Sequence, residues 1–173
     1  MKSFSNVIKV VQIGDPQTGK SSLYLRHHKG EFVDSPFNLG VDFYSKIVEL
    51  GEEQIKIYFW DYHTNERVSS ITRNYYKQCS VVMISYDITN RQSFDRIQSW
   101  FNDYYQKKQN KEAILALIGN KCDLEQQRQV SYLEGQQLAK SLGMIFFEVS
   151  AKTGYQINEL FECLISNAIN IQN

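Results

Sequence analysis

A glycine-containing segment near the N-terminus constrains this chain more than any other feature. The eight residues Gly14 to Ser21 read GDPQTGKS, follow directly on an apolar run at residues 7–13 and precede a helix-forming stretch. The order strand, Gly-x-x-x-x-Gly-Lys-Ser, helix places successive backbone N–H groups around one concavity at a helix N-terminus, where an anion is stabilised. An ordinary glycine turn with an exposed lysine is the alternative, and it leaves the match at four fixed positions unexplained. The sequence therefore predicts a phosphate-binding loop.

The residues of this loop have distinct expected roles. The Lys20 ammonium adds a full positive charge next to the outer phosphate groups, and the Ser21 hydroxyl is a ligand for Mg²⁺. The other residues contribute backbone N–H groups at the start of the following helix. The predicted nucleotide-binding residues of this segment are Gly14, Gln17, Thr18, Gly19, Lys20, Ser21 and Ser22.

The composition excludes several classes of protein. Of the 173 residues, 19 are basic and 19 acidic, so no polybasic surface for nucleic acid or a membrane is indicated. The three cysteines are widely spaced and form no Cys-x-x-Cys pair, which argues against a disulfide framework or a zinc site. No apolar run approaches the length of a membrane span, and the N-terminal residues leave no room for a signal peptide. We expect a single domain over residues 1–173 in a reducing, cytoplasmic compartment.

Apolar strand patterns alternate with helical patterns along the chain. The second and third strands meet around Gly51-Glu52 and are expected to pair as an antiparallel hairpin. Ser131 and Glu134 form a capping box that opens one helix. This alternation predicts an α/β fold in which ligands bind at the carboxyl ends of the strands. Strands are expected at residues 7–13, 42–50, 54–60, 81–87, 113–119 and 144–149, and helices at 21–28, 67–78, 93–108, 131–142 and 157–170.

A second motif, Asn120-Lys121-Cys122-Asp123, follows the expected strand 113–119. The Asp123 carboxylate can accept hydrogen bonds from the N1–H and the 2-amino group of guanine, whereas adenine presents a lone pair at N1. Lys121 can lay its apolar stem against the base, and Asn120 can tie this segment to the phosphate loop. A polar turn after a strand is an equally good reading of these four residues alone. Ser150-Ala151-Lys152, after the last strand, favours the guanine site because a backbone N–H there can meet the guanine oxygen.

These motifs resemble, in order and spacing, those of the small GTPases of the Ras superfamily. The phosphate loop, Trp60-Asp61, residues 120–123 and residues 150–152 all match, and the resemblance covers about residues 7–170. Within the superfamily the chain is most similar to Rab proteins, through the segments at 39–43, 71–76, 86–89 and 119–124.

The resemblance implies the fold of a P-loop NTPase, with a six-stranded, mostly parallel sheet and helices on both faces. It implies binding of GTP or GDP with Mg²⁺, with Phe32 near the guanine and Asp61 acting on the metal through water. Two nucleotide-sensing switches are expected at residues 34–43 and 61–76. Effector and regulatory proteins that contact these switches are the expected partners.

A partner surface is expected on the third strand. Side chains alternate along this strand, so Trp60 lies on the face opposite to Ile57 and Phe59. Phe43 and Tyr75 match the two positions that join this tryptophan in Rab proteins. A cluster of exposed aromatic rings is typical of binding surfaces, and the alternative is that the three rings simply cover the sheet.

Several positions depart from the family pattern. Asn38 stands where the family has a metal-ligating Thr, Thr64 replaces a hinge Gly, and Asn65 replaces the Gln that orients the attacking water. In the phosphate loop, Pro16 lacks an N–H and Gln17 stands where the family's Gly adopts a positive φ. Phosphoryl transfer depends on positioning, whereas binding is spread over many groups. We therefore expect nucleotide binding, a metal site at Ser21, Asn38 and Asp61, and slow hydrolysis because of Asn65 and Thr64. Alternatively, these are tolerated variations in an ordinary switch.

Three functions remain open. The first is a Rab-like GTPase that acts as a molecular switch in vesicle and membrane trafficking. The second is a non-catalytic nucleotide-binding module that acts through constitutive partner contacts, and the third is an ATP-using P-loop enzyme, which Asp123 disfavours. We expect a monomer that binds no nucleic acid. Peripheral attachment to endomembranes is expected only if a lipidated tail is missing from this chain, because its last cysteine, Cys163, lies in an expected helix.

The histidines are expected to have structural roles. His63 has no recognisable metal or carboxylate partner, so it is read as a solvated loop residue. His27 and His28 close the first helix, where an imidazolium suits the negative end of the helix dipole.

Overall fold

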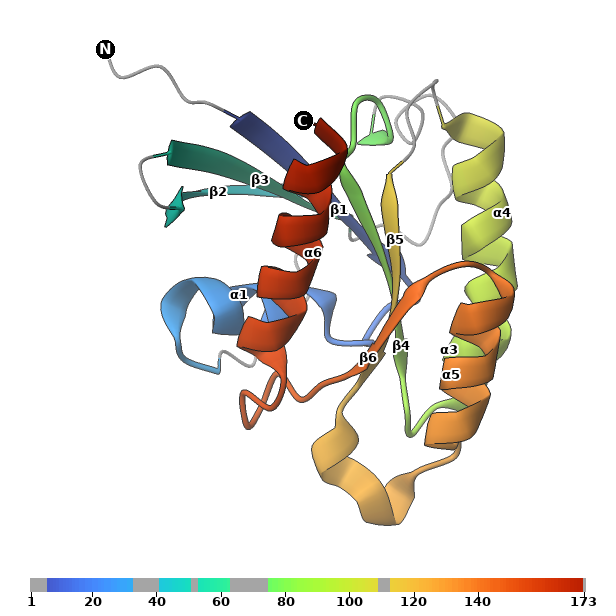
Figure 1. Cartoon of the computed structure of the whole chain (residues 1–173). Coiled ribbons are helices and arrows are strands. Elements are labelled where there is room, and N and C mark those ends of the chain that lie inside the picture. Colours follow the sequence, from blue (N-terminus) through green and yellow to red (C-terminus); the bar gives the residue numbers. More distant parts are fainter. Residues whose placement is uncertain (1–5, 33–40, 51–52, 63–74, 109–112, 173) are drawn as a thin grey trace.

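The computed structural model describes residues 6–32, 41–50, 53–62, 75–108 and 113–172 (Figure 1). Its strands are β1 (Asn6–Gly14), β2 (Val41–Leu50), β3 (Glu53–Tyr62), β4 (Val81–Asp87), β5 (Ile114–Asn120) and β6 (Ile145–Glu148). Its α-helices are α1 (Lys20–Lys29), α3 (Arg91–Asp95), α4 (Ile97–Lys107), α5 (Tyr132–Ser141) and α6 (Ile157–Gln172), and η1 (Cys122–Gln127) is a 3-10 helix.

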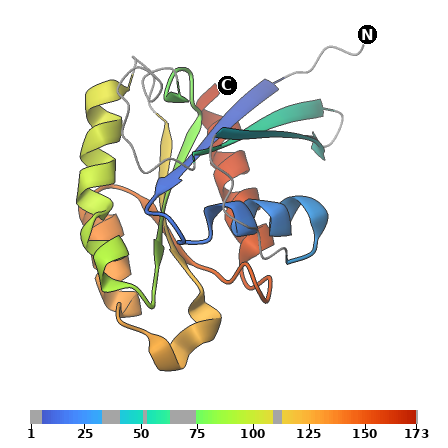
Figure 2. The same cartoon turned by 180° about the vertical axis from the view of Figure 1, so that it is seen from behind.

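The strands form one six-stranded sheet in the order β2-β3-β1-β4-β5-β6. β2 pairs antiparallel with β3, as the hairpin prediction required, and the other pairings are parallel. Helices α1 and α6 cover one face of this sheet and α3, α4 and α5 cover the other, which Figures 1 and 2 show from opposite sides. The predicted fold class, a mostly parallel sheet with helices on both faces, is confirmed.

The sheet separates two apolar cores, and β4 shows how the sequence fills both. All seven residues of β4 are buried, because helices cover both faces of this central strand. Val81 and Met83 pack with α1 and α6, whereas Val82, Ile84 and Tyr86 pack with α3, α4 and α5. Successive side chains of a strand point to opposite faces, so one continuous apolar run serves both cores.

One expected helix is wrong. Residues 93–108 do not form a single helix, because a short helix α3 begins at Arg91 and ends before α4 starts at Ile97. Asn90 caps α3 by accepting a hydrogen bond from the Ser93 N–H, and Arg96 lies between the two helices. The apolar residues on either side of Arg96 keep helical spacing, so the pattern did not reveal the break.

The other expected helices and the remaining strands differ little from the structure. The ends of these elements shift by no more than two residues where the structure describes them. The expected helix at 67–78 lies mostly outside the described residues. The capping box of Ser131 and Glu134 is present at the start of α5. No helix among the described residues is long and apolar enough to span a bilayer.

Candidate functional site

The loop between β1 and α1 has the conformation that the glycine-containing motif predicts. Gly14, Gln17 and Gly19 have φ values of 139°, 63° and 82°. A Cβ on Gly14 would lie 2.2 Å from the carbonyl oxygen of Ser85, so no other residue fits there. The expectation that Gln17 adopts a positive φ is confirmed, at a cost on the order of 1 kcal/mol for a residue with a side chain.

Lys20 lies inside this loop. Its side chain bends back over the turn, and its Nζ donates to the carbonyl oxygens of Gly14 at 3.0 Å and Asp15 at 2.8 Å. Gly19 is the N-cap residue of α1, and no side chain among the described residues caps this helix N-terminus. Ser21 and Ser22 are half-buried in the first helical turn. A fixed positive charge beside an uncapped helix N-terminus fits a phosphate group.

Asn120 joins the three predicted motifs. It ends β5, is 1 % exposed, and donates from its side-chain nitrogen to the carbonyl oxygen of Thr18 at 2.9 Å. Its side-chain oxygen accepts from the backbone N–H groups of Lys121 at 2.8 Å and Ala151 at 3.3 Å. The predicted tie between the second motif and the phosphate loop is therefore confirmed.

Asp123 lies at the surface with its carboxylate held in place. Oδ1 accepts a hydrogen bond of 2.6 Å from the hydroxyl of Ser150, which is fully buried. The Ser150 oxygen in turn accepts from the Thr153 N–H at 3.0 Å. Residues 123 and 150, which the sequence placed in separate motifs, thus contact each other directly. The remaining expected residues, Phe32 and Lys152, are exposed.

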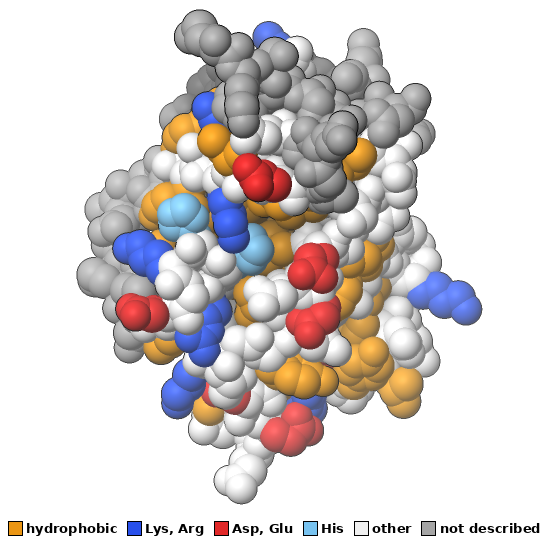
Figure 3. Space-filling model, turned by 60° about the vertical axis from the view of Figure 1, so that its left-hand side comes forward, with side chains coloured by type: hydrophobic (Ala, Val, Ile, Leu, Met, Phe, Trp, Pro, Cys, Tyr) orange, Lys and Arg blue, Asp and Glu red, His pale blue; other side chains and the backbone are white. Residues whose placement is uncertain are grey.

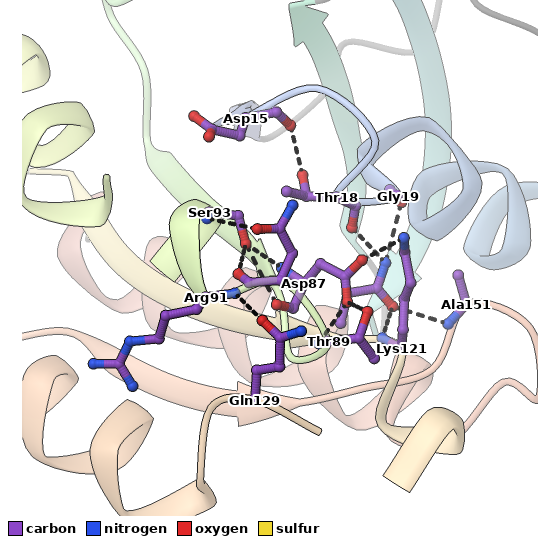
Figure 4. A network of polar contacts seen from close by, with 12 residues as sticks. Asp15, Thr18, Gly19, Asp87, Thr89, Arg91, Ser93, Lys121, Gln129 and Ala151 are labelled. Carbon is purple, nitrogen blue, oxygen red and sulfur yellow. Dashed lines mark hydrogen bonds and ion pairs between the residues drawn. The ribbon is translucent and has the colours of Figure 1, made fainter. Parts of the chain in front are cut away.

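Asp87 was missed by the sequence analysis. Its carboxylate pairs with the ammonium of Lys121 at 2.5 Å and accepts hydrogen bonds from the N–H and the hydroxyl of Thr89 (Figure 4). Lys121 is therefore anchored at its charged end, close to Asn120. The spacing of Asp87 and Thr89 is that of a local Asx turn, which was the available signal.

Asp15 was missed as well. One carboxylate oxygen accepts from the indole N–H of Trp100 at 2.9 Å, and the other accepts from the Arg96 guanidinium at 3.1 Å. Arg96 and Trp100 are four residues apart at the start of α4, so they share one side of the helix. The spacing of Arg96 and Trp100 is visible in the sequence. Their shared partner, Asp15, is not, because it lies 81 positions before Arg96 and 85 before Trp100.

Comparisons with known proteins agree with this geometry. The sequence pattern of the Ras family matches residues 9–170. The chain belongs to the Ras family. It is 41 % identical over 161 residues to "GTP-binding protein ypt2" of Schizosaccharomyces pombe, covering 92 % of this chain and 80 % of that protein. It is also 41 % identical to "Ras-related protein Rab-2B" of Dictyostelium discoideum (92 % and 79 % covered) and 36 % identical to "Ras-related protein Rab-17" of Mus musculus (90 % and 72 % covered).

The resemblance to a Rab-like small GTPase is thereby confirmed, and with it the Ras-family fold. Ras-family proteins bind GTP and GDP.

The switch positions that depart from the Ras-family pattern lie mostly outside the described residues. Asn38, His63, Thr64 and Asn65 all fall there. For Asp61 the structure describes the backbone, which lies opposite Gln12 of β1 at the end of β3. Of the three expected metal ligands, only the side chain of Ser21 is therefore described.

The three aromatic rings expected on the partner surface contact one another. The ring centroids of Phe43 and Trp60 are 5.1 Å apart, and those of Trp60 and Tyr75 are 6.2 Å apart. Phe43 is 51 % exposed, and Trp60 lies on the face opposite to Ile57 and Phe59, as predicted. The expectation that all three rings are exposed is wrong, because Tyr75 is 3 % exposed.

The hydroxyl of the buried Tyr75 links two strands. It donates to the backbone carbonyl oxygens of Gln12 in β1 and Trp60 in β3. A phenol buried with satisfied hydrogen bonds is a structural residue. Trp60 itself is half-buried, because the core on the α4 side of the sheet packs against it.

His27 also differs from expectation. Its ring stacks on Phe161 of α6 with centroids 3.9 Å apart, and neither ring nitrogen has a hydrogen-bond partner among the described residues. The side chain of His27 is half-buried. Figure 3 shows histidine side chains beside Lys and Arg side chains on this face of the molecule. Burial, with Lys46 and His28 nearby, lowers the pKa of His27 to about 4. The residue is therefore neutral at pH 7, and the predicted imidazolium at the end of α1 is wrong at this position.

Proposed function

We propose that this chain is a Rab-like small GTPase that binds GTP and GDP with Mg²⁺ and acts as a molecular switch in vesicle trafficking. The observation that carries the proposal is the side chain of Asn120, which bonds to the phosphate loop, to the following residue and to the 150–152 segment at once. One buried amide thus fixes the distance between a phosphate-binding loop and a base-binding segment.

The described residues support separate roles in nucleotide binding. Lys20 contributes charge for the outer phosphates, and the backbone N–H groups of Gln17 to Ser22 surround them. Asp123, oriented by Ser150, selects guanine, and Lys121, anchored by Asp87, lies under the base. Phe32, Ala151 and Lys152 complete the proposed base site, the last two through their backbone.

We assign the metal to Ser21, Asn38 and Asp61. When bound, Mg²⁺ would neutralise charge on the phosphate oxygens. The position of Ser21 in the first turn of α1, beside the phosphate loop, supports this assignment. An amide oxygen at Asn38 can ligate Mg²⁺, but its NH₂ group needs other partners, so a weaker closed switch is expected.

Hydrolysis is proposed to be slow. The products are GDP and inorganic phosphate, formed when water attacks the terminal phosphorus. Asn65 is one methylene shorter than the Gln that orients this water in the family, and Thr64 is stiffer than the hinge Gly. Binding does not depend on either residue, so affinity is retained while the rate falls.

The partners are proposed to be effector and regulatory proteins that read Phe43 and Trp60, with Tyr75 supporting the patch from below. The 51 % exposure of Phe43 supports this assignment. We further propose a monomeric, single G domain over residues 1–173 that works peripherally at endomembranes.

The identity of the nucleotide that co-purifies with the chain tests the proposal. We expect denaturation to release GDP or GTP, together with Mg²⁺, in near-equimolar amount. Lys20→Ala should carry none, because the phosphate charge is then uncompensated. A purified, folded chain that carries no nucleotide and takes up none would contradict the proposal. Guanine nucleotide binding without hydrolysis in single-turnover assays would instead indicate a non-catalytic binding module.

A further inference from the structure

Asp15 places a negative charge inside a loop that is proposed to bind negatively charged phosphates. Its side chain is 11 % exposed, so solvent screens the carboxylate poorly. A carboxylate in this position opposes phosphate binding unless it is turned away and neutralised. The question is therefore which groups of the protein perform that task.

The two carboxylate oxygens each have their own donor from α4. Trp100, 6 % exposed, donates its indole N–H to Oδ1 at 2.9 Å, and Arg96 donates to Oδ2 at 3.1 Å. Both donors lie at the start of α4, where the helix dipole also favours a carboxylate. Figure 4 shows the Asp15 carboxylate directed away from Thr18 and Gly19.

The backbone of Asp15 is tied to the opposite side of the loop. Its carbonyl oxygen accepts from Lys20 Nζ at 2.8 Å and from the Thr18 hydroxyl at 2.9 Å. The position of the Asp15 side chain is therefore linked through a single residue to the position of Lys20. A carboxylate that left α4 would bring its charge toward the ammonium that the phosphates need.

We propose that Arg96 is a positioning residue for the nucleotide, which neutralises the Asp15 carboxylate and holds it against α4. This inference rests on the proposed function of guanine nucleotide binding. The Arg96 side chain is 58 % exposed, so a surface residue at the N-cap of α4 controls the charge of the phosphate loop from outside. Trp100 supplies the buried, uncharged half of the same anchor.

The test measures the dissociation rate of a fluorescent GDP analogue from the Mg²⁺-loaded full chain. Arg96→Ala should accelerate release about fivefold at low salt, the upper range for an ion pair with one exposed partner. The acceleration of release by Arg96→Ala should be smaller in about 0.5 M salt, because mobile ions screen the exposed charge. Arg96→Lys should restore most of the slow release.

A charge-specific rescue separates this role from a merely structural one. In an Asp15→Asn background the carboxylate is gone, so adding Arg96→Ala should change the release rate little. Arg91→Ala is the matched control, because Arg91 is an exposed arginine of α3 that pairs with Asp95 and Glu134 and, among the described residues, forms no ion pair with the loop. It should release GDP like the unmodified chain.

The outcomes distinguish the inference from the function on which it rests. If the unmodified chain does not bind the GDP analogue, the proposed function is wrong. If it binds, and Arg96→Ala releases the analogue at the unmodified rate, the positioning role is wrong. Equal acceleration by Arg96→Ala with and without Asp15→Asn would also overturn it, because the effect would not depend on the carboxylate.

Discussion

Asn120 donates a hydrogen bond of 2.9 Å from its buried side chain to the carbonyl oxygen of Thr18, 102 positions earlier in the chain. The end of β5 and the loop after β1 are thereby held as one unit. A guanine nucleotide has to contact a phosphate loop and a base site at a fixed separation, and in the proposed function this bond fixes that separation. Preorganisation of this kind raises affinity because little ordering remains to be done on binding.

We predict that Asn120→Ala destabilises the fold and accelerates nucleotide release. The Thr18 carbonyl oxygen and the N–H groups of Lys121 and Ala151 each lose a partner in a buried site, so the loss should be at least about 2 kcal/mol. Chemical denaturation and GDP release measure the two effects. Asn102→Ala is the control, because that exposed amide accepts only from Gln98 in the described structure. Equal stability of Asn120→Ala and the unmodified chain would refute the role of this tie.

The second prediction concerns hydrolysis. Replacing Asn65→Gln and Thr64→Gly together should raise the single-turnover rate about tenfold, which corresponds to roughly 1.4 kcal/mol of transition-state stabilisation. The reason is that the longer amide reaches the attacking water and glycine frees the backbone N–H. Affinity for GTP should stay the same. An unmodified chain that already hydrolyses GTP as fast as the double variant would show that these residues are tolerated variations.

His27 should make stability depend on pH. Its folded-state pKa of about 4 lies below the ordinary value of 6.5, so the unfolded chain takes up a proton first as the pH falls. The contribution of His27 is therefore complete above about pH 6.5 and is lost progressively toward pH 4. The upper limit of the loss is about 3 kcal/mol, since each unit of pKa corresponds to about 1.4 kcal/mol.

Measuring the free energy of unfolding by chemical denaturation, at pH values from about 7.5 to about 4.5, checks this prediction. His27→Phe should keep the ring contact with Phe161 and flatten the pH dependence over this range, whereas His28→Phe, at an exposed site on the same helix, should retain it. If the His27→Phe chain keeps the full pH dependence of stability, that dependence arises from another group.

Substitutions at Phe43 and at Tyr75 should have different effects, the first on partner binding and the second on stability. Phe43→Ala removes an exposed ring, so we expect an unchanged melting temperature and, for partners that read this patch, a loss of binding. Tyr75→Phe removes only the hydroxyl that bonds to Gln12 and Trp60, so we expect a loss of about 1 kcal/mol in the free energy of unfolding. A lowered melting temperature for Phe43→Ala would mean that its ring serves the fold.

The sequence predicted the elements better than the contacts between them. Short apolar runs between helical patterns predicted all six strands, because burial of a strand on one or both faces leaves a local pattern in the sequence. The resemblance to the Ras superfamily indicated the positive φ of Gln17, which the structure has. The break at Arg96, the burial of Tyr75 and the neutral state of His27 were missed. The burial of Tyr75 and the neutral state of His27 depend on side chains brought together from distant segments, which no local pattern records.

The same limit applies to the candidate site. Lys20, Asn120 and Asp123 were predicted as site residues because their residue types and spacing match a chemical task. Asp15 and Asp87 were not, because each acts through a partner on another element, and only the folded chain brings that partner near. Residues that position a site are therefore harder to predict than residues that contact its ligand.

Competition between GTP and ATP for the site tests the central claim most directly. A fluorescent GDP analogue bound to the unmodified chain should be displaced by GTP at concentrations on the order of 10³-fold lower than by ATP, because adenine would leave the Asp123 carboxylate unsatisfied. Asp123→Ala should remove most of this preference while Lys20 still binds the phosphates. Displacement by ATP as readily as by GTP from the unmodified chain would contradict the account.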